Sequence, residues 1–406
     1  MEGTAHADAA QRLPEFPQPR TCPYHPPAGY RTLREQQGPL ARVRLYDGRA
    51  VWTVVGHAEA RALLTDPRLS SDWSHPGFPV TSPRRASIQK QALLIGMDAP
   101  AHTAYRRRLI SAFTARRINE LRPAIQRRTD ELVDAILRQG PPAELSGALA
   151  LPLSSLVICH ILGVPYEDHT YFEQQTARLV ARQAGEQDTL DALRGLRGYL
   201  DALIVRKEGE PGDGLIDTLV QEDLADGTLS REEISALALI LLMAGHETTA
   251  GMITLGTLAL LEHPDQLAAF RADPRLVPGA VEELLRFLSV ADVATRVAAE
   301  DVQVGALTIR EGDGVLLPNS AINRDPRAYP DPDHLDLART DARHTAFGHG
   351  AHQCLGQNLA RTELQIALHT LVTRIPTLRV AGPADRLAVK PADSGVQGIY
   401  ELPLAW

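Results

Sequence analysis

One cysteine, Cys354, stands in a run of residues that few structural roles would require. Gly348 and Gly350 precede it and Gly356 follows it, and glycine allows positive φ and close approach of the backbone to a ligand. From Leu355 onward apolar residues recur at helical spacing, so Cys354 is predicted at a junction between a loop and a helix. Helix N-terminal amides stabilise a thiolate, and a thiolate is a suitable ligand for haem iron. The alternative is a buried structural cysteine, the usual role of a free Cys.

A second stretch places polar residues inside a long apolar helix. Residues 230–233 (SREE) have the pattern of an N-terminal capping box, and no proline follows before residue 262. A helix over residues 231–262, about 48 Å long, is therefore predicted. Its residues 244–249 (AGHETT) would be costly to bury unless they are hydrogen-bonded. Either a second helix begins here with Glu247 and Thr248 as caps, or the Thr248 hydroxyl bonds a preceding carbonyl and bends the helix.

Two further pairs of polar residues have helical spacing. Glu283 and Arg286 lie at positions i and i+3, and His102 and Arg106 lie at i and i+4, so each pair shares one helix face. Taken alone, the first pair is typical of a solvated surface, and the second is typical of a basic helix face.

The elements that must position these residues are mostly helices. Helical spacing covers residues 57–64, 101–137, 151–162 and much of 165–207. Two β-rich runs, residues 40–46 and 50–55, are joined across Asp47-Gly48 and predict a hairpin. Further short strands are expected within residues 296–304, 307–310 and 314–317.

Composition excludes several classes of function. The net charge of −8 argues against general nucleic-acid binding, which prefers a basic surface. An uninterrupted run of about 18 apolar residues is absent, which predicts no transmembrane helix, and the N-terminal residues lack the pattern of a signal peptide. Cys22, Cys159 and Cys354 are too few and too scattered for a disulfide framework. We therefore expect a cytoplasmic protein that binds neither nucleic acid nor a membrane.

Four motifs resemble, in order and spacing, those of the cytochrome P450 superfamily. They are the His102–Arg106 helix, the acid–threonine pair after Ala244-Gly245, the Glu283–Arg286 pair, and the loop with the pattern Phe347-x-x-Gly-x-x-x-Cys354-x-Gly. The resemblance spans roughly residues 20–406 and is closest to a soluble group from antibiotic-producing soil bacteria.

The resemblance implies a mainly α fold with small β-sheets, in which haem lies between a long central helix and the cysteine loop. It implies one catalytic domain over residues 1–406, with residues 1–20 as a flexible arm. Cys354 would bind the iron of heme b, with Phe347 and Gly348 beside the cofactor. The expected propionate contacts are His102, Arg106, Arg296 and His344. Glu247 and Thr248 would be catalytic and would handle protons, whereas Glu283, Arg286 and Arg339 would form a buried structural network.

The activity implied is monooxygenation, the insertion of one atom of O2 into a hydrophobic small molecule. Members of the group hydroxylate macrolides, polyenes, steroid-like compounds and drugs, so the role would lie in secondary metabolism or xenobiotic oxidation. Electrons would come from NAD(P)H through a ferredoxin reductase and a ferredoxin. Three alternatives stay open: a peroxide-driven P450 peroxygenase, a non-catalytic haem-binding sensor, and a cysteine-nucleophile enzyme with His352 as base.

This interpretation predicts a docking patch for the electron donor and the walls of a substrate pocket. The arginines Arg106, Arg107, Arg108, Arg116 and Arg117 predict a basic docking patch for an acidic ferredoxin. Residues 71–96 and 165–205 are expected to flank the substrate pocket. Residues 290–295 should line it opposite Met243 and Ala244, and Arg84 and Arg85 are candidates to meet a polar or acidic group of the substrate. With aromatic residues at 5% of the chain, the walls should be mostly aliphatic.

Overall fold

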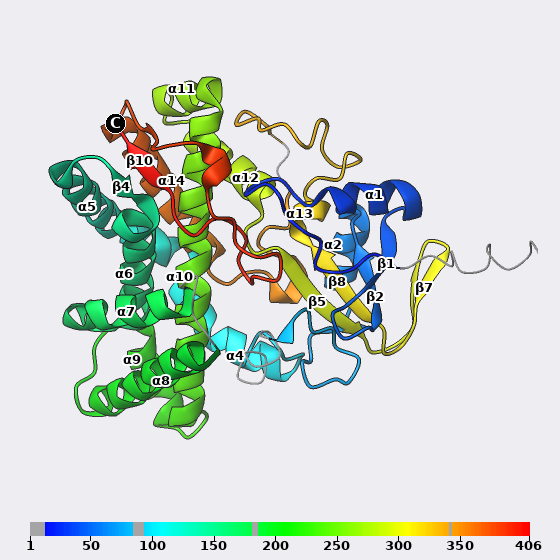
Figure 1. The fold of residues 1–406 in the computed structure, drawn as a ribbon. Helices are drawn as coiled ribbons and strands as arrows, with labels where there is room; N and C mark the ends of the chain where they lie inside the picture. The colour runs from blue at the N-terminus through cyan, green and yellow to red at the C-terminus, as the bar shows by residue number, and fades with distance from the viewer. Residues whose placement is uncertain (1–12, 84–92, 181–185, 341–342) are drawn as a thin grey trace, which may run out of the picture.

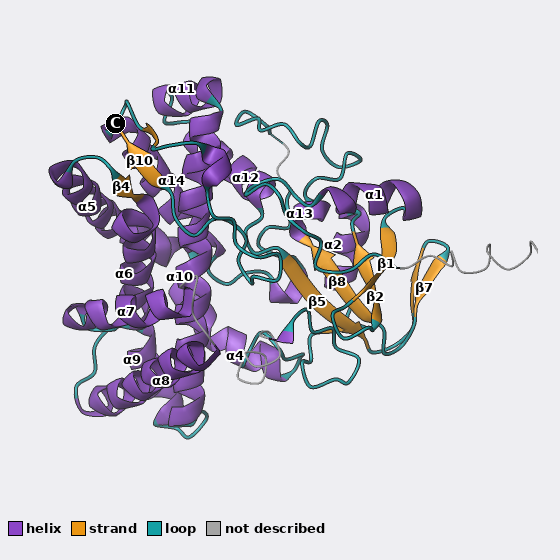
Figure 2. Ribbon diagram, viewed as in Figure 1, coloured by secondary structure: helices purple, strands orange, loops and turns teal. Residues whose placement is uncertain are grey.

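The structure is a computed structural model that describes residues 13–83, 93–180, 186–340 and 343–406. Helices form most of it (Figures 1 and 2). The strands of the larger sheet lie on one side, whereas the small sheet β4-β10-β9 lies beside the helices. The helices are α1 (Ala28–Gln37), α2 (His57–Thr65), α4 (Ala101–Leu109), α5 (Ala115–Gln139), α6 (Leu151–Leu162), α7 (His169–Val180), α8 (Glu186–Gly209), α9 (Leu215–Leu219), α10 (Arg231–Glu262), α11 (Pro264–Ala272), α12 (Val277–Leu288), α13 (Asn319–Ile322) and α14 (Gln357–Arg374). The strands are β1 (Leu40–Arg44), β2 (Ala50–Val54), β3 (Leu69–Ser70), β4 (Ala143–Glu144), β5 (Val293–Ala298), β6 (Val302–Val304), β7 (Leu307–Ile309), β8 (Gly314–Pro318), β9 (Arg379–Val380) and β10 (Pro403–Ala405).

Helix α10 is the axis of the helical side, where it packs against α6, α8 and α14 (Figure 1). The predicted capping box is present: the Ser230 hydroxyl accepts from the Glu233 N–H, and the Glu233 carboxylate accepts from the Ser230 N–H at 2.8 Å. The helix runs from Arg231 to Glu262 without a break, which confirms the predicted bounds and excludes the alternative that a second helix starts within it. The Thr248 hydroxyl donates to the Ala244 carbonyl at 2.8 Å, as expected for an intrahelical bond.

The same helix bears on the expectation that the chain has no transmembrane helix. By length and composition alone α10 is long and apolar enough to cross a membrane, because its few polar residues do not offset the apolar residues around them. The protein interior covers it, however, and 61% of its most apolar window is buried. Burial on all sides is the ordinary reason for a helix that is apolar all round.

The larger sheet has the strand order β1-β2-β8-β5-β3 (Figure 2). The β1–β2 hairpin is antiparallel, as predicted, and β2 then pairs parallel to β8, which pairs antiparallel to β5. Strand β5 begins at Val293, three residues before the expected start. The expected helix over residues 101–137 is interrupted between α4 and α5, where Thr114 caps the N-terminus of α5 by accepting from the Arg117 N–H.

The N-terminal residues 13–20 are attached to the sheet, so the prediction of a flexible arm over residues 1–20 does not hold for them. Phe16 is only 3% exposed, and its N–H donates to the Arg44 carbonyl at 2.8 Å. Arg20 reaches Asp292 at 3.4 Å, just before β5, and both side chains are buried. The rest of the predicted arm, residues 1–12, lies outside the described residues.

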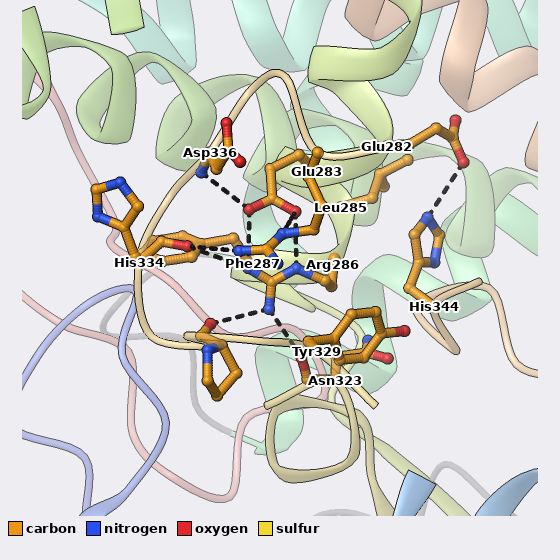
Figure 3. Close-up of polar contacts among 12 residues, drawn as sticks. Glu282, Glu283, Leu285, Arg286, Phe287, Asn323, Tyr329, His334, Asp336 and His344 are labelled. Carbon is orange, nitrogen blue, oxygen red and sulfur yellow. Dashed lines mark hydrogen bonds and ion pairs between the residues drawn. The ribbon is translucent and has the colours of Figure 1, made fainter. Parts of the chain in front are cut away.

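The predicted ion-pair network is confirmed, and its Glu283–Arg286 pair is fully buried (Figure 3). The Arg286 guanidinium donates to both carboxylate oxygens of Glu283, at 2.7 and 2.8 Å, and to the carbonyls of Asn323 and Pro332. Arg339 adds a bond to Glu283 at 3.1 Å. The network therefore fixes α12 to the chain that leads into the Cys354 loop.

Candidate active site between helix α10 and the Cys354 loop

A cavity of about 450 Å³ separates α10 from the Cys354 loop. Its lining includes Ala244 and Thr248 from α10, and Phe347, Gly348 and Cys354 from the loop. The fold therefore brings together the two stretches that the sequence singled out for chemistry, although about 100 residues separate them along the chain.

The loop needs two of its glycines for its shape. Gly348 and Gly350 have φ angles of 69° and 76°, in the left-handed region. A Cβ on Gly350 would also lie 2.5 Å from the Leu64 carbonyl oxygen at the end of α2. The Cys354 N–H donates to the Phe347 carbonyl at 2.8 Å, which closes the loop before α14 begins at Gln357.

The Cys354 sulfur lies inside the protein, yet its side chain is exposed because its free surface faces the cavity. Burial raises the pKa of the Cys354 thiol, an effect that the Gly356 N–H and the charges of Arg106 and Arg361 oppose. A coordinating metal ion deprotonates a thiol in such a site. The position and surroundings of this sulfur thus fit an iron ligand and do not fit an inert core cysteine.

Positively charged and polar groups that have no carboxylate partner in the described part of the chain gather at the edge of the cavity. They are His102 and Arg106 on α4, Arg296 on β5, and His352 in the loop. The His102 and His352 rings lie 4.0 Å apart between centroids. The two guanidinium groups donate to backbone carbonyls, Arg106 to Gln353 and Arg296 to Thr295, each at 2.7 Å.

The charges at this edge of the cavity suit an anionic ligand. Among the described residues neither guanidinium lies within 4.0 Å of a carboxylate. Burial lowers the pKa of Arg296 to about 10, and burial together with Arg296 and His102 lowers the pKa of His352 to about 3. Buried cations of this kind require anionic partners. The two propionates of a haem whose iron meets Cys354 would supply them, so the residues present fit that cofactor.

His344 does not line this cavity, so the structure does not support the propionate role that the sequence suggested. Its Nε2 lies 3.2 Å from the Glu282 carboxylate, and its Nδ1 accepts from the Ala346 N–H (Figure 3). Although burial raises the pKa of Glu282, the bonds from His344 and Arg361 lower it to about 2. His352 occupies the cavity edge instead. Its position two residues before Cys354 was the available signal, but the sequence interpretation used it only for a catalytic base.

Glu247 turns away from the cavity, whereas Thr248 lines it. The Glu247 carboxylate forms an ion pair with the Lys390 ammonium at 2.8 Å. Thr249, the next residue along α10, also lines the cavity. The acid–threonine pair is therefore split in this structure, with the hydroxyl inside the cavity and the acid on the outer side of α10.

The wall opposite α10 is close to the expected one. Between residues 290 and 295 all but Asp292 line the cavity, and they face Ala244, whereas Met243 is not part of the lining. From residues 71–96, Trp73, Leu94 and Ile95 contribute, but no described residue of 165–205 does. Arg84 and Arg85 lie outside the described residues.

The five arginines of the predicted docking patch, a basic segment of the chain, do not all face outward. Arg106 faces the cavity, and Arg108 pairs with Asp223 at 2.5 Å. Arg117 lies 3.5 Å from Glu120. Arg107 and Arg116 are exposed, which leaves a smaller outward-facing patch than the sequence suggested.

Comparison with known proteins agrees with this geometry. The cytochrome P450 family model matches residues 169–375. The chain is 56% identical over 392 residues to pentalenic acid synthase of Streptomyces avermitilis, with 96% of this chain and 97% of that protein covered. It is 49% identical over 408 residues to the vitamin D3 dihydroxylase of Streptomyces griseolus, with 100% of both chains covered.

A solved structure extends the likeness to the fold. The crystal structure of GfsF, a P450 of Streptomyces halstedii, superposes with a TM-score of 0.93 at 44% identity, and the match covers 97% of this chain and 100% of that one. The chain therefore belongs to the cytochrome P450 family of haem-dependent monooxygenases.

Proposed function

We propose that this P450 hydroxylates a large hydrophobic molecule and that residues 1–406 form one catalytic unit. The observation that carries the substrate class is the aliphatic wall between residues 290 and 295, which faces Ala244 across a cavity into which Cys354 opens. The names of the relatives, a pentalenic acid synthase and a vitamin D3 dihydroxylase, support a terpenoid-like or sterol-like substrate over a small polar one.

A binding screen tests this substrate class. A library that holds sterols, terpenoids, macrolides and small polar compounds is added to the haem protein, and the shift of the haem absorption spectrum is recorded. We expect the large hydrophobic compounds to give the shift. If only small polar compounds do so, the proposed substrate class is wrong.

We infer that the cofactor is heme b, with Cys354 as the iron ligand and with His102, Arg106, Arg296 and His352 around the propionates. When bound, haem with a thiolate ligand supplies the activation of O2 and the transfer of one oxygen atom. The reaction converts a C–H bond, O2, two electrons and two protons into a C–OH group and water. The chain itself must hold the substrate, exclude bulk water and deliver the protons.

Thr248 and Glu247 are the residues that we propose for proton delivery. The Thr248 hydroxyl lies in the cavity, and its own proton is engaged by the Ala244 carbonyl, so its oxygen can accept a hydrogen bond there. Glu247, one residue earlier, is half-buried and can exchange protons with solvent. A proton relay of this kind is typically worth about 10²–10⁴ in rate.

Replacing Thr248 by alanine should uncouple electron use from hydroxylation. The variant should still bind haem and substrate and still consume NADPH, but more of the electrons should leave as H2O2, because the hydroxyl that orders the proton donor is gone. The measurement is product formed per NADPH consumed. Thr257→Ala is the matched control, since its hydroxyl makes the same bond to the Ile253 carbonyl at 2.8 Å on a part of α10 outside the cavity lining. Full coupling in Thr248→Ala would show that another group orders the proton donor.

We propose a ferredoxin, reduced by a ferredoxin reductase with NAD(P)H, as the electron donor in the cytoplasm. Arg107 and Arg116 are exposed, and they lie on the α4–α5 stretch whose Arg106 contacts the Cys354 loop. A local basic patch on an acidic protein favours an acidic partner steered by charge.

Reversing the charge of this patch should slow reduction by ferredoxin. In the double variant Arg107→Glu and Arg116→Glu we expect the bimolecular rate to fall about tenfold or more at low salt and its salt dependence to flatten. Stopped-flow reduction at several ionic strengths measures this. Arg138→Glu is the control, because Arg138 is exposed at the far end of α5, about 33 Å from Arg116. If ferredoxin reduces both variants at the same rate, Arg107 and Arg116 do not form its docking site. If H2O2 alone supports product formation at the ferredoxin-driven rate, that result favours a peroxygenase.

A further inference from the structure

The segment before the C-terminal strand contributes to the cavity and is built around Lys390. The Lys390 N–H donates to the Gly398 carbonyl at 2.8 Å, next to a bridge between Val389 and Ile399. Gly395, at the turn of this segment, lines the cavity. We call residues 389–399 the C-terminal loop. It is one wall of the site, although it follows Cys354 by more than 30 residues.

The C-terminal loop is fastened to both other walls. The Gln397 N–H donates to the Val290 carbonyl at 2.8 Å, which ties the loop to the wall before β5. The Lys390 ammonium donates to the Glu247 carboxylate at 2.8 Å, which ties the loop to α10. The second tie is the one that involves a residue proposed for proton delivery.

The Lys390–Glu247 pair is half-buried and specific. The two side chains are 10% and 33% exposed. The Lys390 ammonium also lies 6.0 Å from the centre of the Tyr400 ring, which favours a cation there. Lysine is rare in this chain, at positions 90, 207 and 390 only. Among the described residues, Glu247 is the only carboxylate within 4.0 Å of Lys390.

We propose that Lys390 is a positioning residue that holds Glu247 outside the cavity until substrate displaces the C-terminal loop. The inference rests on the proposed role of Glu247 in proton delivery. In the present arrangement the carboxylate faces Lys390 and does not line the cavity, so it cannot pass a proton to a group beside Thr248. To do so it must change rotamer and leave the ammonium.

The loop supplies the physical link to substrate. Lys390 and Gly395 belong to the same hydrogen-bonded loop, so a substrate that packs against Gly395 acts on the element that carries the ammonium. A ligand shifts such an equilibrium when it binds one arrangement better than the other. Once released from the ammonium, the Glu247 carboxylate takes a proton from solvent and passes it to dioxygen being reduced in the cavity. Without substrate the carboxylate stays on Lys390, and electrons are not wasted on O2.

The test uses the haem protein without any organic ligand. The protein is reduced with dithionite, freed of excess reductant and mixed with oxygenated buffer, and its return to the oxidised spectrum is timed. Each molecule gives one electron to O2, and a proton accompanies that electron. In Lys390→Met, where the carboxylate is no longer held, we expect reoxidation to be roughly three- to tenfold faster than in the wild type. Lys390→Arg retains the charge and should restore the slow rate.

A second readout separates positioning from a structural role. Amide hydrogen exchange of residues 389–399 should be faster in both Lys390→Met and Glu247→Gln, because either change unfastens the loop from α10. Reoxidation should be fast only in Lys390→Met, and the double variant should return to a slow rate because the acid is absent. These two results together support the proposal.

Two outcomes would overturn it, and they differ in what they imply. If Lys390→Met speeds amide exchange but leaves reoxidation unchanged, the ion pair only fastens the loop, while the relay through Glu247 stands. If Glu247→Gln hydroxylates substrate at the wild-type rate, the relay itself is absent, and Lys390 has no acid to position.

Discussion

Replacing Cys354 by serine is expected to abolish hydroxylation and the thiolate signature of the reduced carbon monoxide complex, while helical content stays unchanged. A serine hydroxyl is a far weaker ligand than a thiolate and does not donate electron density to the iron in the same way. The fold should persist because Cys354 has its free surface in the cavity and fills no core position. The carbon monoxide difference spectrum and far-ultraviolet circular dichroism measure the two properties separately.

Cys22→Ser is the matched control for this change. Cys22 is a partly buried free cysteine outside the cavity lining, so its variant should retain the spectrum and the activity. An unaltered thiolate spectrum in Cys354→Ser would show that the iron ligand lies elsewhere.

Replacing Arg286 by methionine should prevent accumulation of folded, haem-loaded protein. The change leaves the fully buried Glu283 carboxylate with Arg339 as its remaining cationic partner, and it removes donors from the Asn323 and Pro332 carbonyls (Figure 3). Breaking a buried ion pair by removing one partner costs about 3–5 kcal/mol. That is a large part of the 5–15 kcal/mol by which proteins of this kind are stable. The yield of haem protein and its urea unfolding midpoint measure the effect.

An exposed ion pair of similar local geometry provides the control. Arg275 donates to Asp273 two residues earlier, and its side chain is 91% exposed. Because solvent screens such a pair, Arg275→Met should leave the midpoint within experimental error of the wild type. If Arg286→Met has the same midpoint as Arg275→Met, the buried network does not hold α12 to the Cys354 loop.

Local sequence signals predicted those parts of the site that depend on neighbours along the chain. The capping box at Ser230 set the start of α10, and the absence of proline set its length. The glycines around Cys354 indicated a loop that opens toward a ligand, and Asp47-Gly48 indicated the hairpin. In each case the physical cause lies within a few residues, such as a cap, a positive φ or a turn.

Features that depend on distant contacts could not be predicted in this way. The outward position of Glu247 depends on Lys390, which lies 143 residues away in the sequence. Which histidine meets the cavity depends on how the chain turns at Gly348 and Gly350, and this turn places His352 inside and leaves His344 with Glu282. The attachment of the N-terminal residues to the sheet through Phe16 could not be predicted either, because a single buried residue produces no periodic pattern in the sequence.

The two ends of the chain close the same wall of the cavity, and this has a consequence for synthesis on the ribosome. Arg20, near the N-terminus, bonds Asp292, whereas Gln397, nine residues from the C-terminus, bonds the Val290 carbonyl. Chains are made from the N-terminus at about 5–20 residues per second. The helices up to α12 can therefore pack during translation, but the wall is complete only when Gln397 has emerged. The haem cavity is thus completed only after Gln397 has been made, and a nascent chain arrested before Gln397 would present an unfinished pocket.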